Sequence, residues 1–162
     1  FSKTAKVLAP DTHYLRGTFD GANREVIPVE YNPQAEGPLT ITLADNKIDL
    51  YLRGVDATNG KPVINYGNYG VLYTVSLPTK GVGRVSYYLL PRGGDYAGAI
   101  GIENPYTPWG PLATPLGRLH FGSDKSRDFA FLGTYDSGEP LSITFSPPGG
   151  SNLPVMILAI PQ

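Results

Sequence analysis

The sequence of 162 residues lacks cysteine altogether, which excludes disulfide bonds, thiolate metal sites and cysteine nucleophiles. Charge is scarce as well, since only 17% of the residues are charged and the formal net charge is -1. Lys and Arg form no basic block along the chain. Proteins that bind the phosphate backbone of nucleic acids need such a block, so we expect no nucleic-acid partner.

Long apolar runs are also missing. The longest, Val155 to Ile160, has the length of one strand and is too short for a membrane-spanning helix. The chain begins at Phe1 and shows no signal peptide, so we expect a processed product, a proteolytic fragment or a domain excised from a longer precursor. Eleven tyrosines with one methionine and no cysteine are typical of secreted bacterial surface modules, which predicts an extracytoplasmic setting.

Helical periodicity is absent, because 20 glycines and 16 prolines interrupt the chain and no apolar stripe of 3.6-residue period lasts three turns. Short alternating runs separated by turn residues are present instead. We predict one all-β domain over residues 1–162, a two-sheet antiparallel sandwich of jelly-roll type with about ten strands. Residues 1–10 would form an extended arm.

The stretch from Asn65 to Ile102 carries the clearest pattern. Polar and apolar residues alternate in Tyr69–Leu77 and again in Arg84–Leu90, which predicts two strands that each place one face on the core. The turn between them contains Pro78 and two glycines, residues that suit a hairpin loop. We therefore predict that these strands pair as a core hairpin.

Other segments follow the same rhythm. Further strands are predicted at His13–Phe19, Arg24–Tyr31, Leu39–Leu43, Ile48–Leu52, Phe129–Tyr135, Leu141–Phe145 and Leu153–Ile160. Pro28 places the second of these at a sheet edge or beside a bulge. The third and fourth flank Asp45 and Asn46 and are predicted to form a second hairpin. The segment Glu103–Gly117, with four prolines and the single Trp, predicts a long irregular loop.

Catalytic patterns are weak. The two histidines, His13 and His120, accompany no serine in a nucleophile elbow. Among 14 acidic residues some close pair is inevitable, so such a pair says nothing about glycoside hydrolysis. We predict no catalytic residues and no enzyme.

Oxygen ligands for calcium are available at two predicted turns. Asp45 and Asp49 lie near the first, and Asp56 and Asn59 lie at the second. Neither turn has the spacing of a calcium-binding loop, and Asp in turns more often caps the local backbone. We expect no cofactor, and calcium stays open as the one candidate.

Exposed aromatic rings could form a sugar-binding platform, because the C–H bonds of a sugar pack on a flat ring. Five aromatic residues lie in or beside Gly- and Pro-rich loops, namely Tyr66, Tyr69, Tyr96, Tyr106 and Trp109. The alternative is that these rings cover the ends of the sheets.

The last strand is apolar on both faces. Either it is a central strand covered on both sides, or it presents a face to another chain. In the second case Val155, Met156, Leu158 and Ile160 would make the contact, and the arm at residues 1–10 could pair with a neighbour in the same way.

Three segments, NYGNYGVLYTVSLP, PRGGDYAGAI and LGTYDSGEPLSITFSPPGGSNLPVMI, resemble the C-terminal part of a family of uncharacterised, mostly cyanobacterial proteins. That family looks exported or envelope-associated, and the resemblance implies a bacterial, extracytoplasmic setting and an all-β domain, without an activity. The prediction is a non-catalytic structural or interaction module of a bacterial cell surface that assembles with itself or with other envelope proteins. The alternative is a carbohydrate-binding module that uses loop aromatics, with or without calcium.

Overall fold

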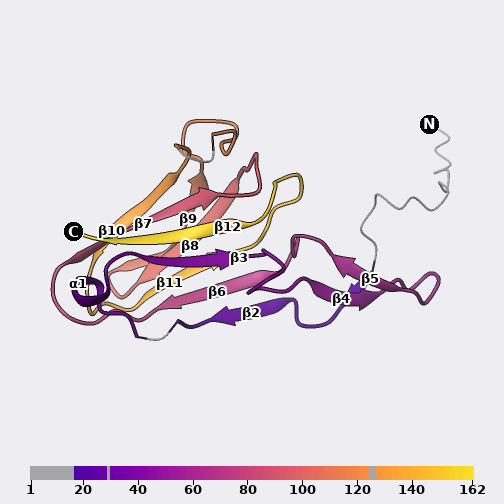
Figure 1. Cartoon of the computed structure of the whole chain (residues 1–162), viewed down its shortest axis with the longest axis horizontal. Helices are drawn as coiled ribbons and strands as arrows, with labels where there is room; N and C mark the ends of the chain where they lie inside the picture. The colour runs from indigo at the N-terminus through magenta and orange to yellow at the C-terminus, as the bar shows by residue number, and fades with distance from the viewer. Residues whose placement is uncertain (1–16, 29, 125–126) are drawn as a thin grey trace.

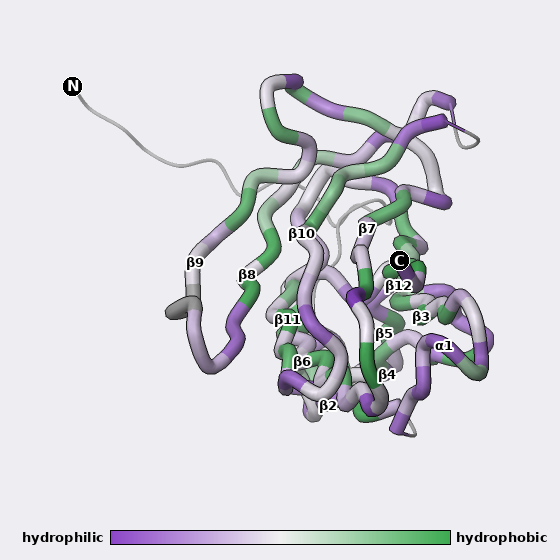
Figure 2. Tube along the Cα trace, turned by 90° about the vertical axis from the view of Figure 1, so that its left-hand side faces the viewer, coloured by the Kyte–Doolittle hydropathy of each residue, from purple (hydrophilic) through white to green (hydrophobic). Residues whose placement is uncertain are grey.

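Two stacked β-sheets form the body of the protein, and a small third sheet extends from one end (Figure 1). The computed structural model describes residues 17–28, 30–124 and 127–162, without the side chains of residues 107–109. Viewed along the sandwich, the two large sheets lie on opposite sides of the core (Figure 2).

The first large sheet has four strands in the order β10-β7-β12-β3, formed by Ala130–Asp136, Arg84–Pro91, Val155–Pro161 and Leu39–Leu43. The second has five strands in the order β2-β6-β11-β8-β9, formed by Asn23–Val26, Leu72–Leu77, Leu141–Phe145, Gly98–Asn104 and Thr107–Thr114. The small sheet has the order β1-β4-β5, formed by Thr18–Phe19, Leu52–Val55 and Pro62–Asn65. One short helix, α1 (Pro33–Glu36), precedes β3.

The chain crosses repeatedly between the two large sheets. It passes from β6 in the five-stranded sheet to β7 in the four-stranded sheet, and returns for β8 and β9. It then alternates again through β10, β11 and β12. This is the connectivity of a jelly roll, so the predicted all-β sandwich is confirmed. The strand pairs are antiparallel, except that β2 runs parallel to β6.

The predicted core hairpin is wrong, because β6 and β7 do not pair with each other. The inward side chains of β6, such as Tyr73 and Val75, and those of β7, such as Val85 and Leu89, meet from opposite sheets. Alternation identifies the face of each strand that is buried, but it does not identify the neighbouring strand. The glycine-containing turn therefore connects two layers and does not close a hairpin.

Aromatic rings occupy the middle of the core. Tyr73, Tyr96, Phe121 and Phe145 are all at most 1% exposed. Phe145 lies 5.9 Å from the ring centroid of Tyr73 and 6.4 Å from that of Tyr96, and the ring of Tyr96 meets Phe121 edge-on at 5.8 Å. Offset and edge-to-face contacts of this kind add about 0.5–1.5 kcal/mol per pair to the free energy gained by burial.

The second predicted hairpin is also absent. Ile48 and Leu50, predicted to face the core, are 86% and 60% exposed, and strand β4 begins only at Leu52. The carboxylate of Asp45 accepts hydrogen bonds from the backbone N–H groups of residues 47, 48 and 49, which curls the segment into a turn. Those N–H groups are then not available for a ladder with β3.

The predicted irregular loop at Glu103–Gly117 is instead a β-hairpin. Strand β9 pairs with β8 along most of its length, with Ile100 opposite Leu112 and Gly101 opposite Pro111. Proline is tolerated here because β9 is an edge strand. Proline has no backbone N–H to donate, and an edge strand has a neighbour on one side only. Pro28 follows the short edge strand β2, in agreement with the predicted edge position. Of the strand predicted at His13–Phe19, residues 13–16 lie outside the described part of the chain.

Candidate functional site

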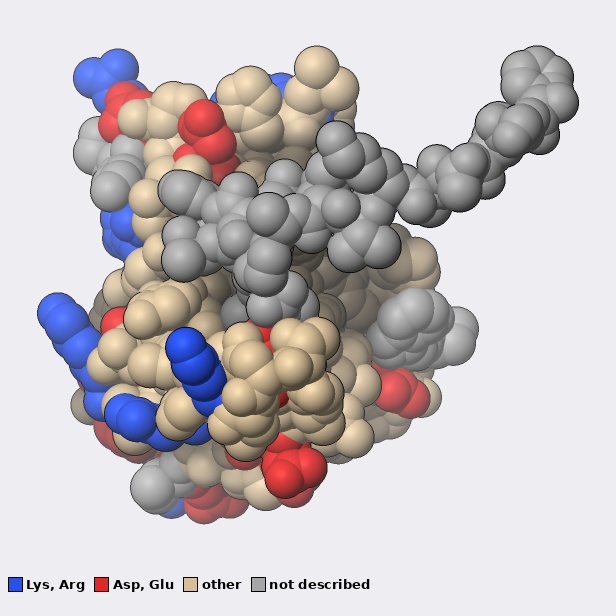
Figure 3. All heavy atoms as spheres, turned by 90° about the vertical axis from the view of Figure 1, so that its right-hand side faces the viewer, with Lys and Arg blue, Asp and Glu red and all other residues tan. Residues whose placement is uncertain are grey.

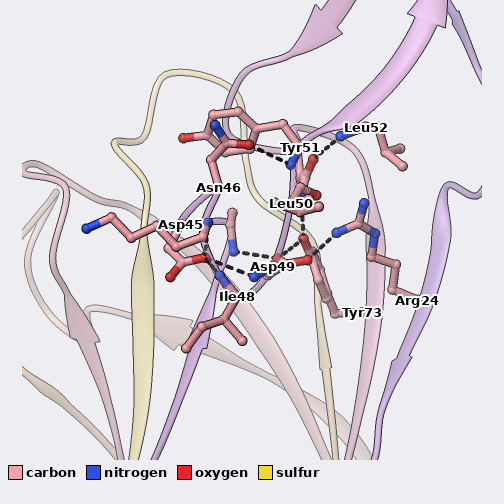
Figure 4. A network of polar contacts seen from close by, with 12 residues as sticks. Arg24, Asp45, Asn46, Ile48, Asp49, Leu50, Tyr51, Leu52 and Tyr73 are labelled. Carbon is pink, nitrogen blue, oxygen red and sulfur yellow. Dashed lines mark hydrogen bonds and ion pairs between the residues drawn. The ribbon is translucent and has the colours of Figure 1, made fainter.

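A network of polar side chains connects the five-stranded sheet to the segment between β3 and β4 (Figure 4). Asp49 is at its centre: one carboxylate oxygen pairs with the guanidinium of Arg24 on β2. The other oxygen accepts a hydrogen bond from the hydroxyl of Tyr73 at 2.6 Å and one from the backbone N–H of Ala44 at 2.5 Å. Burial and the neighbouring Asp49 carboxylate raise the pKa of Tyr73 well above its ordinary value, so its hydroxyl remains a donor at neutral pH.

Asn68 completes this network from the turn before β6. Its amide donates hydrogen bonds to the Tyr73 hydroxyl at 2.8 Å and to the carbonyl of Leu50 at 3.2 Å, and its oxygen accepts the N–H of Leu52 at 2.8 Å. The side chain is fully buried, and the backbone has a positive φ of 56 at Asn46 and 51 at Asn68. Asn is one of the few residues with a side chain that adopts this conformation readily. The network holds in place the segment between β3 and β4, which we call the crossing segment. Its role is therefore structural.

The four residues proposed for calcium accept hydrogen bonds or an ion pair within the protein, and the side-chain oxygen of Asn59 accepts the backbone N–H of Lys61 at 2.9 Å. Three backbone N–H groups occupy Oδ1 of Asp45, and Asp56 accepts hydrogen bonds from the hydroxyl of Thr58 at 2.6 Å and the amide of Asn59 at 3.0 Å. Burial would raise the pKa of Asp45, but these backbone hydrogen bonds outweigh it and lower the pKa. Asp49 belongs to the network above. Among the described residues, no three His, Cys, Asp or Glu side chains are grouped to hold a metal ion.

The five aromatic residues proposed for sugar binding do not form one platform. Tyr96 is 1% exposed, so its predicted exposure is wrong: its ring packs in the core against Phe121. Tyr69 is half-buried and donates a hydrogen bond to the carbonyl of Ser151 at 2.6 Å.

Tyr66 and Tyr106 are 66% and 77% exposed, but they lie at opposite ends of the five-stranded sheet. Strands β6 and β8 run in the same direction, since β11 is antiparallel to both. Tyr66 precedes β6, whereas Tyr106 follows β8. The backbone of Trp109 lies in β9, and its side chain is outside the described part of the structure.

A groove of about 440 Å³ lies at the end of the five-stranded sheet remote from the Asp49 network, and its lining includes Pro105, the residue before Tyr106 in the sequence. Its lining comes from Ile27, Ser76, Leu77, Pro78, Glu103, Asn104, Pro105, Pro140, Leu141 and Ser142. Proline rings and an exposed isoleucine supply apolar surface, and a carboxylate, an amide and two hydroxyls supply hydrogen-bonding groups. Sequence reasoning did not find this groove, because its residues come from separate turns and strand ends.

A second surface covers the outside of the four-stranded sheet. We call it the apolar outer face, and it consists of Tyr88, Leu90, Phe129, Phe131, Met156, Leu158 and Ile160. Three of these residues alternate along β12 with side chains that are buried in the core. The face therefore results from the two-sided apolar pattern noted in the last strand.

The cross-strand register brings these side chains together. Leu158 lies opposite Tyr88, and Tyr88 lies opposite Phe131, so one apolar row crosses β12, β7 and β10. The ring of Tyr88 contacts Phe129 at 5.5 Å and Phe131 at 5.4 Å, and both phenylalanines are 53% exposed. Cross-strand aromatic contacts of this kind stabilise the sheet but leave the outer ring faces in water.

Two of the predictions about the last strand have clear outcomes. Strand β12 is paired on both sides, with β7 and with β3, so it is a central strand and its backbone cannot add a neighbouring chain. Val155 is 0% exposed and faces the core, so its proposed contact with a partner is wrong. Met156, Leu158 and Ile160 face outward. The arm at residues 1–10 lies outside the described residues.

Charged side chains are a minority on the face of the molecule that Figure 3 shows. In the view of Figure 3, Lys, Arg, Asp and Glu are scattered among a majority of neutral residues. No helix in the described part of the chain is both long and apolar enough to cross a membrane.

Comparisons with known proteins found no match by sequence and a weak structural similarity. No protein-family model and no curated protein matches the chain. Among solved structures, the crystal structure of the Podospora anserina GH26-CBM35 β-(1,4)-mannanase is similar with a TM-score of 0.37 and 13% sequence identity. The match covers 78% of this chain and 28% of that one, so this chain spans less than a third of that protein. A TM-score this low does not relate the two folds strand by strand.

Proposed function

We propose that this chain is a non-catalytic module of a bacterial cell surface that assembles with copies of itself through the apolar outer face. Other envelope proteins are the alternative partners. The observation that carries the proposal is the pair of half-exposed phenylalanines, Phe129 and Phe131, packed on both sides of Tyr88. Contiguous apolar surface of this kind commonly marks a site of protein contact, and aromatic residues dominate the binding energy of such sites.

The titratable groups with displaced pKa values support a non-catalytic role. Perturbed groups in enzymes usually gather in a cleft. Here burial in the core raises the pKa of Tyr87 and of Tyr96, and backbone hydrogen bonds lower the pKa of Asp45. Each of these displacements has a structural cause. The extracytoplasmic setting is supported by the tyrosine-rich, cysteine-free composition and by the family resemblance.

Replacing Phe129 and Phe131 with serine is expected to weaken self-association by about tenfold or more, since a buried aromatic anchor contributes upwards of 1.4 kcal/mol. Sedimentation velocity over a range of protein concentrations measures this effect. The control is Val82→Ser, because Val82 is 82% exposed and lies in the turn between β6 and β7. Equal association by wild type and by the phenylalanine variants would contradict the assignment of the face.

A second candidate function is carbohydrate binding in the groove lined by Pro105. Tyr106 is exposed and directly follows Pro105, which lines the groove together with the carboxylate of Glu103 and the amide of Asn104. An apolar surface with a few hydrogen-bonding groups at its edge suits a sugar ring.

Titration calorimetry with a panel of soluble oligosaccharides tests this second candidate. Both Tyr106→Ala and Glu103→Gln are expected to weaken binding by about tenfold, the effect of losing one stacking or charge-assisted contact. Tyr66→Ala is the matched control, since Tyr66 is similarly exposed at the other end of the sheet. Binding that survives Tyr106→Ala but not Tyr66→Ala would place the site elsewhere.

A further inference from the structure

The four-stranded sheet ends on β3, and β12 is the one described strand that pairs with it. A strand in this position directs every second N–H and C=O group away from its neighbour, ready to pair with another chain. The backbone hydrogen bonds between described residues outside the ladders include none that involves residues 39–43. The free side of β3 is therefore an open edge within the described structure.

The other three edges of the two large sheets carry features that discourage such pairing. Strand β10 contains a bulge between Phe131 and Gly133. Strand β9 contains Pro111, and β2 has four residues and is followed by Pro28. Bulges, prolines and short lengths are the usual means by which proteins protect an edge. Strand β3 is preceded by Pro38, but its own five residues include no proline, glycine or charge, and its ladder with β12 has no bulge.

The sequence of β3 is a palindrome, Leu-Thr-Ile-Thr-Leu. In an antiparallel pair with a two-fold axis at Ile41, Leu39 would lie opposite Leu43 of the second copy, and Thr40 opposite Thr42. Leucines and isoleucines then meet on the core side, and the β-branched threonines meet on the outer side. Such cross-strand pairs are favourable, and no like charges oppose each other. A two-fold interface requires a self-complementary surface of this kind.

We propose that a second copy of this chain binds along β3, so that two four-stranded sheets join into one continuous sheet across a two-fold axis. The proposal rests on the self-assembly proposed above and adds a second contact surface to it, the edge of β3. Leu39 and Ile41 face the core but are only partly buried, and the added strand would cover them.

The joined sheet would also extend the apolar outer face. Thr42 lies opposite Met156, and Thr40 lies opposite Leu158. The two threonines of each copy therefore form the seam between the outer faces of the two copies. Both surfaces used in assembly would then belong to the same sheet.

Disulfide trapping tests the register directly, because the chain has no cysteine of its own. Opposite residues of an antiparallel pair have Cα atoms about 4.5–5.5 Å apart, which a disulfide spans. Thr40 of one copy and Thr40 of the other would be offset by two residues along the strands, with Cα atoms about 8 Å apart, which is too far for a disulfide. The same holds for the two copies of Thr42. A mixture of Thr40→Cys and Thr42→Cys proteins is expected to yield cross-linked dimers under mild oxidation, and either protein alone very few.

Two further variants complete the experiment. A mixture of Thr42→Cys with Val82→Cys is the control for random collision, since Val82 is exposed and lies in the turn between β6 and β7. The double variant Thr40→Lys and Thr42→Lys places lysine opposite lysine and is expected to weaken dimerisation by at least tenfold, with an unchanged circular dichroism spectrum.

The outcomes separate this inference from the proposed function. Loss of association in the Phe129 and Phe131 variants, without cross-links in the mixture, would overturn the β3 interface and leave the apolar outer face in place. Cross-links in the mixture, with unaffected association of the phenylalanine variants, would support β3 and overturn the face. Equal cross-linking by single variants would show a different register, and a monomer at every soluble concentration would overturn both.

Discussion

Replacing Asn68 with alanine is expected to lower the free energy of unfolding by about 3–4 kcal/mol. The substitution removes three hydrogen bonds: the one to the Tyr73 hydroxyl is buried, and those to the N–H of Leu52 and the carbonyl of Leu50 are part-buried. Each such loss costs about 1 kcal/mol. Alanine must also adopt the positive φ of 51 found at this position, which adds about 1 kcal/mol. Urea unfolding followed by circular dichroism measures the difference.

Two companion variants separate these contributions. Asn68→Gly loses the same hydrogen bonds without the backbone strain, so it is expected to be about 1 kcal/mol more stable than the alanine variant. Tyr73→Phe removes the hydroxyl that joins Asn68 to Asp49 and is expected to cost about 1–2 kcal/mol. A loss below 1 kcal/mol in Asn68→Ala would show that the network does not hold the crossing segment.

Raising the pH from 10 to 12 is expected to destabilise the fold strongly. Burial raises the pKa of Tyr87 to about 12 and that of Tyr96 to about 12, whereas unfolded tyrosines ionise near pH 10. Ionisation therefore favours the unfolded chain once the pH exceeds 10. The stabilisation is complete below pH 10 and is lost as the pH rises to 12, by about 2–3 kcal/mol for each of the two residues.

Urea unfolding at a series of alkaline pH values, with tyrosinate absorbance recorded in the folded protein, measures this loss. Tyr87→Phe is expected to flatten the dependence on pH, because phenylalanine does not ionise. Tyr106→Phe is the control, since Tyr106 is 77% exposed and lies outside the core. If all tyrosines of the folded protein titrate together near pH 10, the buried phenols do not contribute in this way.

Strand alternation was a reliable guide to the faces of the strands. The inward sets predicted for Leu141–Phe145 and for Tyr69–Leu77 are buried except for the half-buried Tyr69, with Ile143, Tyr73 and Val75 each 0% exposed. The pattern failed where a polar side chain intervened. Ile48 and Leu50 alternate as a strand would, yet the carboxylate of Asp45 binds the N–H groups that a ladder would need.

Pairing could not be inferred from the same pattern. The turn from Pro78 to Gly83 is as suitable for crossing between sheets as for closing a hairpin, because the sheets of a sandwich lie about 10 Å apart. The hairpin of β8 and β9 was missed for the converse reason. Prolines suggested a loop, but an edge strand tolerates them.

By itself the sequence determined an all-β domain, the absence of disulfides and the sides of the strands that face the core, because these depend on composition and on neighbours along the chain. The tertiary structure alone decided that Tyr96 is buried while Tyr106 is exposed, and that Val155 faces inward while Leu158 joins an apolar surface. Among the described residues, it also left the edge of β3 without a second neighbouring strand. Those properties depend on strands that are distant in the sequence, and no local pattern specifies which strands become neighbours.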